Sequence, residues 1–191
     1  MGNVLIRWPA AAVRKDIQKE LGLNNDQFNL FVQKYILRLS KGEISEEELW
    51  AEAQKDFGLR AVSVSENLLA RKFQADAIVY SDVLEFAKKL KKDGYKIAIL
   101  SNTISAHEKV CINKGVTEPF DHIFLSYQVG LRKPDPKFYY YVLDKLGVKP
   151  TEALFIDDIK ENVEAASNLG IRTIWADHPA TIVEKAMLEL K

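Results

Sequence analysis

The feature that most constrains the fold is the alternation of apolar runs and amphipathic segments from Tyr80 to the end of the chain. The apolar runs are short, whereas the amphipathic segments repeat apolar positions three and four residues apart. Strands that alternate with helices in this way are typical of βαβ units. We therefore predict an α/β fold with a Rossmann-like parallel sheet. The strands are expected at 96–100, 122–126, 153–157 and 171–175, and the helices at 82–92, 106–114, 137–146, 160–169 and 179–190.

The stretch before this alternation has helical periodicity and no strand signal. Ser45 and Glu48 match a capping box at the start of one helix, and Ser65 is expected to start the last helix. We predict an all-helical domain of about four helices, inserted into the α/β core. The expected boundaries are 10–75 for the helical domain, and 1–9 together with 76–191 for the core.

The composition is that of an ordinary globular protein, with 47% hydrophobic and 28% charged residues among 191. Lys plus Arg equals Asp plus Glu at 27 each, so no overall field favours nucleic acid or an anionic membrane. The single cysteine, Cys111, excludes an intrachain disulfide and suits a reducing compartment. No apolar run approaches the roughly 20 residues that span a bilayer. We expect a cytoplasmic protein with no nucleic-acid or membrane partner.

Polar side chains lie at the ends of two predicted strands and in a loop between them. Ser101 and Asn102 follow one strand, Asp157 and Asp158 end another, and Lys133 lies in a loop held by Pro134 and Pro136. The C-terminal ends of parallel strands meet at one edge of the sheet, where open α/β sheets bind ligands, so these groups can converge. A hydroxyl, an ammonium and a carboxylate pair suited to Mg²⁺ are what a phosphoryl group requires.

Each of these groups has a purely structural alternative. Ser101 and Asn102 can serve as a helix cap, Lys133 as a solvated surface lysine, and Asp158 as the N-cap of the next helix. The acidic pair alone favours neither interpretation, because adjacent carboxylates need a cation only when both are buried and ionised. The ordered combination of all three groups favours the phosphoryl site.

Three segments together resemble the haloacid dehalogenase superfamily of hydrolases. They are Ile-Leu-Ser-Asn-Thr at 99–103, Gly-Leu-Arg-Lys-Pro-Asp-Pro at 130–136 and Phe-Ile-Asp-Asp-Ile-Lys-Glu-Asn at 155–162. Their order and spacing match the second, third and fourth motifs of that superfamily. Gly-Asn-Val at 2–4 resembles the tail of the first motif, and the helical block resembles the small cap inserted after it. The likeness therefore covers essentially the whole chain.

The resemblance implies a role for each polar group. Ser101 would hydrogen-bond the phosphoryl group that is transferred, with Asn102 supporting it. Lys133 would neutralise the phosphoryl oxygens and the nucleophile, and Asp157 together with Asp158 would hold Mg²⁺.

The first motif departs from the family pattern. The family nucleophile is an aspartate two residues before the glycine that is here Gly2, so its position would precede Met1. The general acid, two residues after that nucleophile, would fall on Gly2 itself. The family's first strand, which lies between the strands ending at Ser101 and Asp157, is truncated in the same way. We expect the natural protein to carry about six to ten further residues that end in an aspartate, because unpaired buried backbone groups cost about 1 to 3 kcal/mol each.

The favoured function is a Mg²⁺-dependent phosphatase of a small phosphorylated metabolite, acting through an aspartyl phosphate. The chain as given is expected to be inactive without the nucleophile. A dehalogenase that needs no metal is one alternative, and a non-catalytic relative that binds a phosphorylated ligand or a protein partner is another. A receiver domain is disfavoured, because there the acidic pair comes early in the chain.

Aromatic residues receive simpler interpretations. Trp8 is expected mainly to pack, and it is also a candidate to line the substrate entrance because it lies where the core leads into the helical block. Tyr139, Tyr140 and Tyr141 share one helix and cannot all face the core, which allows an exposed tyrosine or a homodimer contact. His107, with the other two histidines, lacks metal-ligand spacing and is given no catalytic role.

Overall fold

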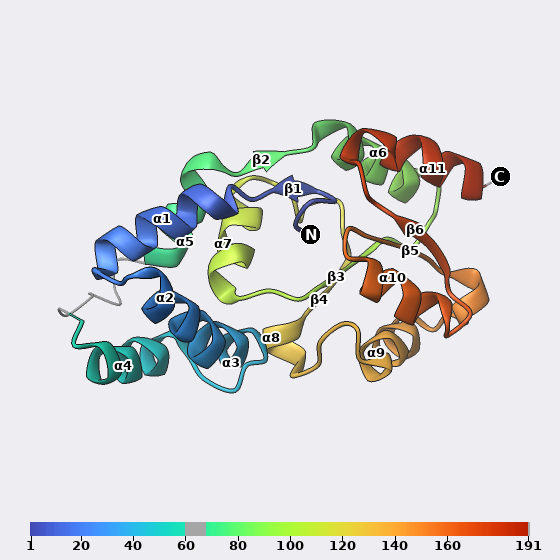
Figure 1. Ribbon diagram of the computed structural model, residues 1–191. Helices are drawn as coiled ribbons and strands as arrows, with labels where there is room; N and C mark the ends of the chain where they lie inside the picture. Colours follow the sequence, from blue (N-terminus) through green and yellow to red (C-terminus); the bar gives the residue numbers. More distant parts are fainter. Residues whose placement is uncertain (60–67, 191) are drawn as a thin grey trace.

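The computed structural model describes residues 1–59 and 68–190. Figure 1 shows a helical part, formed by the N-terminal third of the chain, beside a part in which helices flank short strands. The predicted α/β class is therefore confirmed. No helix within the described ranges is long and apolar enough to cross a membrane. Ser65, the predicted start of a helix, lies outside the described residues.

The helices of the first part begin and end where the sequence supplies signals. The predicted capping box is confirmed, because the Ser45 side chain accepts from the Glu48 N–H and the Glu48 side chain accepts from the Ser45 N–H. Gly22 and Gly58 end two of the helices with left-handed backbone angles. The elements are α1 (Ala10–Leu21), α2 (Asn25–Phe31), the π-helical η1 (Val32–Ile36), α3 (Leu37–Ser40), α4 (Glu46–Phe57) and α5 (Leu68–Asp76).

Helices and strands alternate in the rest of the chain, within a few residues of the predicted positions. The elements are β1 (Ile6–Arg7), β2 (Ile78–Val79), α6 (Ser81–Lys92), β3 (Ala98–Ser101), α7 (Ser105–Asn113), β4 (His122–Leu125), α8 (Ser126–Val129), α9 (Pro136–Leu146), η3 (Pro150–Glu152), β5 (Leu154–Asp157), α10 (Lys160–Ser167), β6 (Arg172–Trp175), η4 (Pro179–Thr181) and α11 (Ile182–Glu189).

The strands that follow α6 pair in parallel, but they do not form the one continuous sheet that the pattern predicts. β3 pairs with β4, and β5 pairs with β6, each over four residues. Within the described residues the strands form separate two-stranded ladders, because no described strand pairs with both β3 and β5. The sheet is therefore divided between the strand that ends at Ser101 and the strand that ends at Asp157.

The N-terminal stretch also differs from the expected strand. It turns at Asn3, which has a φ of 54°, and only Ile6–Arg7 are extended. These two residues pair with Ile78–Val79 in antiparallel register. β1 and β2 are the two connections between the helical part and the α/β part (Figure 1). The hydrogen bonds between β1 and β2 therefore hold the two connections side by side.

The helical part packs directly over the end of β3. Its buried core contains Phe31, Tyr35 and Trp50, and it also takes in Ile104 and Ala106 at the start of α7. These last two residues follow Ser101 by only a few positions. The helical part is thus anchored beside the polar strand ends by shared apolar burial, which is the main stabilising contribution in such packing.

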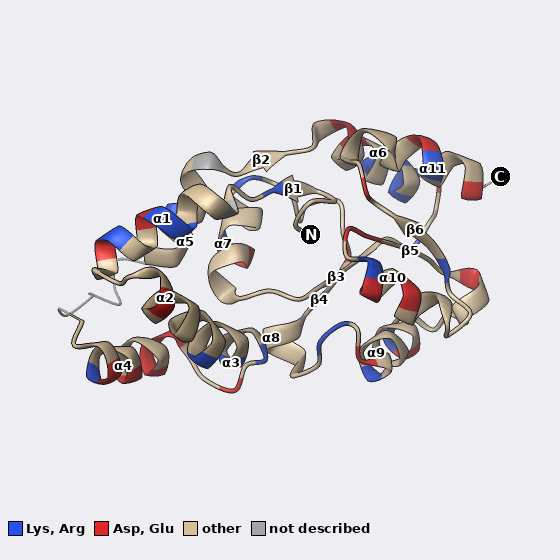
Figure 2. Cartoon of the chain, in the orientation of Figure 1, with Lys and Arg blue, Asp and Glu red and all other residues tan. Residues whose placement is uncertain are grey.

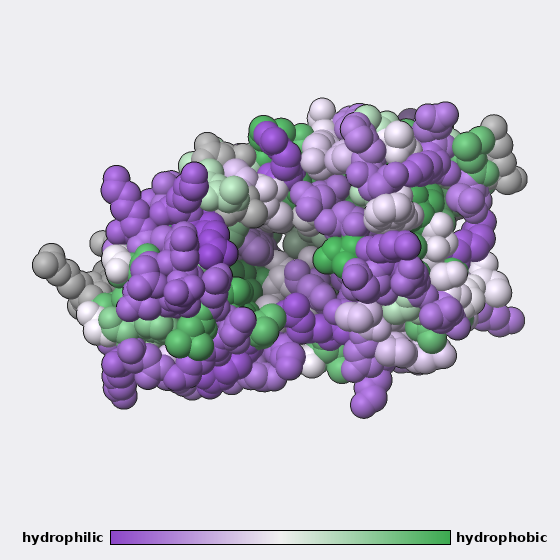
Figure 3. Space-filling model, viewed as in Figure 1, coloured by the Kyte–Doolittle hydropathy of each residue, from purple (hydrophilic) through white to green (hydrophobic). Residues whose placement is uncertain are grey.

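Charged and apolar side chains are distributed over both parts of the surface. Figure 2 shows Lys and Arg interspersed with Asp and Glu on the helical part and on the α/β part alike. The face in Figure 3 is largely hydrophilic, with smaller hydrophobic areas over both the helical part and the α/β part. On the helix that carries three consecutive tyrosines, Tyr139 is buried and Tyr140 is 54% exposed, as expected from the helical spacing.

Candidate active site

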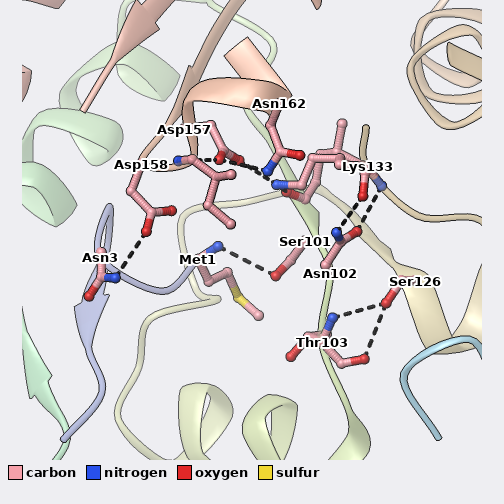
Figure 4. A network of polar contacts seen from close by, with 12 residues as sticks. Met1, Asn3, Ser101, Asn102, Thr103, Ser126, Lys133, Asp157, Asp158 and Asn162 are labelled. Carbon is pink, nitrogen blue, oxygen red and sulfur yellow. Dashed lines mark hydrogen bonds and ion pairs between the residues drawn. The ribbon is translucent and has the colours of Figure 1, made fainter. Parts of the chain in front are cut away.

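Lys133 connects the two halves of the divided sheet. Its Nζ atom donates to Asp157 Oδ2 at 2.5 Å and to the Leu100 carbonyl at 2.8 Å (Figure 4). Lys133 is 7% exposed and Asp157 4% exposed. Lys133 is therefore not the solvated lysine of the structural alternative, but the partner of a buried carboxylate at the ends of β3 and β5.

Asn102 holds the loop that carries Lys133. Its Nδ2 atom donates to the Lys133 carbonyl, and its Oδ1 atom accepts from the Lys133 N–H, both at 2.8 Å. The helix-cap alternative is wrong, because α7 begins after Ile104 and no described side chain caps it. The Asn102 side chain thus makes the same two hydrogen bonds that a neighbouring β-strand would make. These bonds hold the Lys133 backbone in place, and with it the start of the side chain that carries the ammonium.

Asp157 is satisfied on both carboxylate oxygens. Oδ1 accepts from the Ile159 N–H at 2.9 Å and from Asn162 Nδ2 at 2.8 Å, while Oδ2 faces Lys133. Burial raises the pKa of Asp157, but the Lys133 ammonium and these hydrogen bonds outweigh burial and hold the pKa below its usual value. Asp157 is therefore ionised near neutral pH, and the Lys133 ammonium balances its charge.

Asp158 points away from Asp157 and toward the N-terminal turn. Its Oδ2 atom accepts from Asn3 Nδ2 at 2.9 Å (Figure 4). Its carbonyl accepts from Trp175 Nε1 at 3.1 Å. It does not cap α10, because no described side chain caps that helix, and the N–H of Ile159, the residue before the helix, donates to Asp157. The two carboxylates therefore have separate environments, one buried and paired and one half-buried.

Ser101 and Met1 meet at the centre of this group. Ser101 is 4% exposed, and its Oγ atom lies 3.4 Å from the Met1 nitrogen (Figure 4). Burial, and to a smaller extent the nearby Lys133, lowers the pKa of the Met1 amino group to about 6. The backbone nitrogen of Met1 thus occupies the position next to the hydroxyl and the ammonium.

These side chains surround a cavity of about 180 Å³. Trp8 lies in its wall, as expected for a residue near the entrance, and stacks on His107 with ring centroids 4.7 Å apart. Burial lowers the pKa of His107 to about 4, and its Nε2 atom has no hydrogen-bond partner in the described structure. The cavity is thus lined by the charged groups Lys133, Asp157 and Asp158 and by the aromatic pair of Trp8 and His107.

The sequence interpretation gave no role to Asn162 and His107. Asn162 stands five residues after Asp157, so that one turn of α10 returns its amide to the carboxylate. That spacing is readable in the sequence once the helix start is known. His107 has no comparable signal, because its position depends on the packing of Trp8 and Phe73 around it.

A family model for haloacid dehalogenase-like hydrolases matches residues 5–170. The chain belongs to the haloacid dehalogenase-like hydrolases. A mouse acyl-CoA dehydrogenase family member 10 is 27% identical over 152 residues, which are 78% of this hydrolase but 14% of that protein. The hydrolase therefore spans only a small part of this relative. A glyceraldehyde 3-phosphate phosphatase from Methanopyrus kandleri is 27% identical over 69% of this chain and 67% of its own length.

Solved structures resemble this hydrolase along nearly its whole length. A haloacid dehalogenase family enzyme from Bacteroides thetaiotaomicron superposes with a TM-score of 0.83 at 24% identity, covering 95% of this chain and 93% of that one. The same enzyme in complex with magnesium and inorganic phosphate gives a TM-score of 0.78 at 25% identity, covering 92% and 90%. The fold, including the helical part, is thus that of this family.

Proposed function

We propose that this hydrolase is a Mg²⁺-dependent phosphatase of a small phosphorylated metabolite. The observation that carries the proposal is the Lys133 ammonium, held 2.5 Å from Asp157 at the wall of a cavity that also contains the Ser101 hydroxyl. An oriented cation and a hydroxyl donor stabilise the charge of a phosphoryl group during transfer. The relative named as a phosphatase and the neighbour that binds phosphate support the same chemistry.

The donor atoms of the site suit Mg²⁺. Hard oxygen ligands from one or two carboxylates, completed by waters and phosphate, are typical of Mg²⁺ sites. Asp158 keeps one carboxylate oxygen that accepts no hydrogen bond from the described residues, whereas Asp157 has a donor on each oxygen. We therefore assign the metal chiefly to Asp158, with Asp157 as the second carboxylate. When bound, the ion would neutralise phosphoryl oxygens.

The remaining side chains position the substrate. Lys133 would bind a phosphoryl oxygen without leaving Asp157, because an ammonium has three donors. Ser101 would donate its hydroxyl proton to a second oxygen, and Asn102 would keep the lysine loop in place. Trp8 would contact the part of the substrate that extends toward the helical part, where exclusion of water strengthens these interactions.

Covalent catalysis requires a carboxylate beside Ser101 and Lys133. The family resemblance assigns it to the residue before Met1. A residue joined to the Met1 nitrogen, which lies 3.4 Å from Ser101 Oγ, would enter the cavity. Without that carboxylate, attack by water alone would lose many orders of magnitude in rate. The 191-residue chain is therefore expected to bind phosphate and to turn over very slowly.

The test compares three proteins in an aryl phosphate assay with and without Mg²⁺. They are the 191-residue chain, the chain extended by an apolar strand that ends in aspartate, and the same extension ending in asparagine. Only the aspartate form with Mg²⁺ should be active. Equal activity of the aspartate and asparagine forms, or of the unextended chain, would refute the proposal.

Two alternative functions predict different results in the same samples. A dehalogenase would release halide from a haloacid without Mg²⁺. A non-catalytic ligand-binding relative would bind inorganic phosphate, since Lys133 and Ser101 are already assembled, and would leave every ester intact even with the aspartate present. The observation that favours this second alternative is that Lys133 and Ser101 are assembled although the described residues include no nucleophilic carboxylate beside them.

A further inference from the structure

Trp8 lies in the wall of the polar cavity, and two aromatic neighbours hold its ring. The indole stacks on the His107 ring with centroids 4.7 Å apart, and the Phe73 ring lies 5.5 Å away at an angle of 78°. Trp8 directly follows β1, one of the connections between the helical part and the α/β part (Figure 1). Aromatic pairs prefer these stacked and edge-to-face arrangements, so the two neighbours limit how the indole can turn.

Gly2 lies against the pyrrole edge of this indole. A Cβ atom at Gly2 would come within 2.8 Å of both Cδ1 and Nε1 of Trp8. Gly2 does not have a positive φ, so the backbone conformation does not require a glycine here. The close approach of the indole does. Because the nitrogen of Met1, the preceding residue, lies 3.4 Å from Ser101 Oγ, the indole N–H edge lies beside the segment that reaches the phosphoryl-binding groups.

The indole N–H of Trp8 donates to no atom of residues 1–59 and 68–190, and it is not sealed inside the protein. Trp175, by contrast, donates its N–H to the Asp158 carbonyl at 3.1 Å. An indole N–H donates and cannot accept, and a tryptophan at a binding surface uses it as a polar handle. The cavity thus contains an oriented donor that the phosphoryl-binding groups do not include.

A phosphoryl group on Lys133 and Ser101 would not fill the cavity. The volume of about 180 Å³ corresponds to about six waters, which leaves room for an organic part of a few non-hydrogen atoms. In the proposed binding mode this part extends toward Trp8. A neutral acceptor suits the indole N–H, because the cavity already contains the carboxylates of Asp157 and Asp158 against one ammonium.

Building on the proposed phosphatase function, we propose that Trp8 selects the substrate, because its indole N–H donates a hydrogen bond to a hydroxyl oxygen of the organic part. The substrate class is then a small phosphate monoester that carries a hydroxyl group within a few bonds of the ester oxygen. Alkyl phosphates of the same size occupy the same volume but leave the donor without an acceptor. Gly2 makes room for this donor beside the cavity.

The first experiment measures the binding of matched phosphate esters to the 191-residue chain with Mg²⁺ by calorimetry. 2-Hydroxyethyl phosphate is paired with propyl phosphate, and 3-hydroxypropyl phosphate with butyl phosphate, so that the organic parts of each pair are equally long. In at least one pair the hydroxylated ester should bind about three- to tenfold more tightly, which is the contribution of one neutral hydrogen bond. Trp8→Phe keeps an aromatic ring but no donor, and it should lose this preference between paired esters.

The second experiment observes the donor in the unaltered protein. NMR with isotope-labelled tryptophan would show the indole N–H signals of the three tryptophans, and the Trp8→Phe spectrum would identify the signal of Trp8. The hydroxylated esters should move this signal downfield, as expected for a proton that enters a hydrogen bond, and the alkyl esters should not. The Trp175 signal is the internal control, because its N–H already donates to Asp158 and should respond equally to both esters of a pair.

Gly2→Ala tests the placement of the donor. The added methyl group would displace the pyrrole edge, so the hydroxyl preference should fall as in Trp8→Phe although the N–H is still present. Gly22→Ala is the control, since no atom of the described residues lies within 4 Å of a Cβ added there. This variant should keep the preference.

The outcomes separate this assignment from the proposed phosphatase activity. Equal affinities within both pairs, with an unmoved Trp8 signal, would overturn the role of Trp8, while binding of inorganic phosphate would leave the phosphatase proposal standing. Failure of inorganic phosphate and of every ester to bind would overturn both. A hydroxyl preference that depends on Trp8, in a protein whose aspartate-extended form hydrolyses no ester, would refute the phosphatase alone.

Discussion

At the scale of single residues, Lys133 determines the electrostatics of the site. Its ammonium balances Asp157 in a place where both side chains are almost completely buried. Replacing one partner of a buried pair leaves an uncompensated charge, which costs more than the pair contributes. The same residue is held by Asn102, so its position is fixed independently of its charge.

Lys133→Met should therefore lower the free energy of unfolding by about 3 to 5 kcal/mol near neutral pH. Because the folded-state pKa of Asp157 lies below its usual value, the pair stabilises the protein above that usual value and loses its effect as pH falls through the folded-state pKa. Urea unfolding at several pH values would measure both effects. Lys137→Met, at an exposed position of α9, is the control and should change stability by less than about 0.5 kcal/mol. Equal effects of the two substitutions would contradict the assignment.

His107 gives a second prediction at this scale. Its pKa is lowered by burial from 6.5 to about 4, so the folded state keeps it neutral while the unfolded state becomes protonated as pH falls. Stability should decline between these values, by about 2 kcal/mol from about pH 7 to about pH 5. His107→Phe preserves a ring against Trp8 and Phe73 and should remove this decline. His178→Phe, at an exposed position, should retain it, and a pH slope that is identical in all three proteins would disprove the idea.

At the scale of elements, the helical part is joined to the α/β part by a buried polar contact as well as by its apolar core. Ser126 Oγ, at the start of α8, donates to the Ser40 carbonyl at 2.6 Å and accepts from the Thr103 N–H at 2.9 Å. The loop after α3 then passes close to α8. This contact places the loop between α3 and α4 next to the end of β3, and hence near the cavity of the site.

Gly42 lies in that loop, and a side chain there would meet the Tyr127 carbonyl oxygen at 2.1 Å. Gly42→Ala should therefore shift the loop and destabilise the protein by more than the strain of a left-handed residue alone. Gly58 provides a matched control, since its φ of 61° is similar to the 70° of Gly42 and no atom of the described residues lies within 4 Å of an added Cβ. Gly58→Ala should cost about 1 kcal/mol, and Gly42→Ala clearly more. Calorimetric melting of the two variants would show whether this difference exists.

The elements also show which features the sequence can predict. Helices and buried strands after Tyr80 are readable because each has its own period, and the capping box at Ser45 is readable because it is local. The β1–β2 ladder was missed, since two-residue strands have no period. Convergence of Ser101, Lys133 and the acidic pair followed from parallel topology. The hydrogen-bond partners of Asp157 and Asp158 could not be predicted from that topology, because they depend on the directions of side chains at the ends of different strands.

At the scale of the whole molecule, the division of the sheet is the dominant feature. Two parallel ladders, each with one paired edge in the described residues, border an apolar cavity of about 500 Å³. Cavities of this kind lower stability roughly in proportion to their volume, because lining atoms lose contacts. Such cavities also increase the volume of the folded state, and the volume change of unfolding under pressure measures this increase.

High pressure should therefore unfold the 191-residue chain more readily than the chain with an apolar strand joined to Met1. The volume change of unfolding scales with the internal void that is lost, and it lies between about −20 and −100 mL/mol for ordinary proteins. With a cavity of about 500 Å³, the unextended chain should have the more negative value, and the added strand should bring it toward zero. Intrinsic fluorescence of Trp50, which is buried in the helical core, would follow the transition in both proteins. A Gly-Ser extension of equal length, which cannot fill an apolar slot, should leave the volume change as it is in the unextended chain. If all three proteins had the same volume change, the cavity would not be a property of the folded chain in solution.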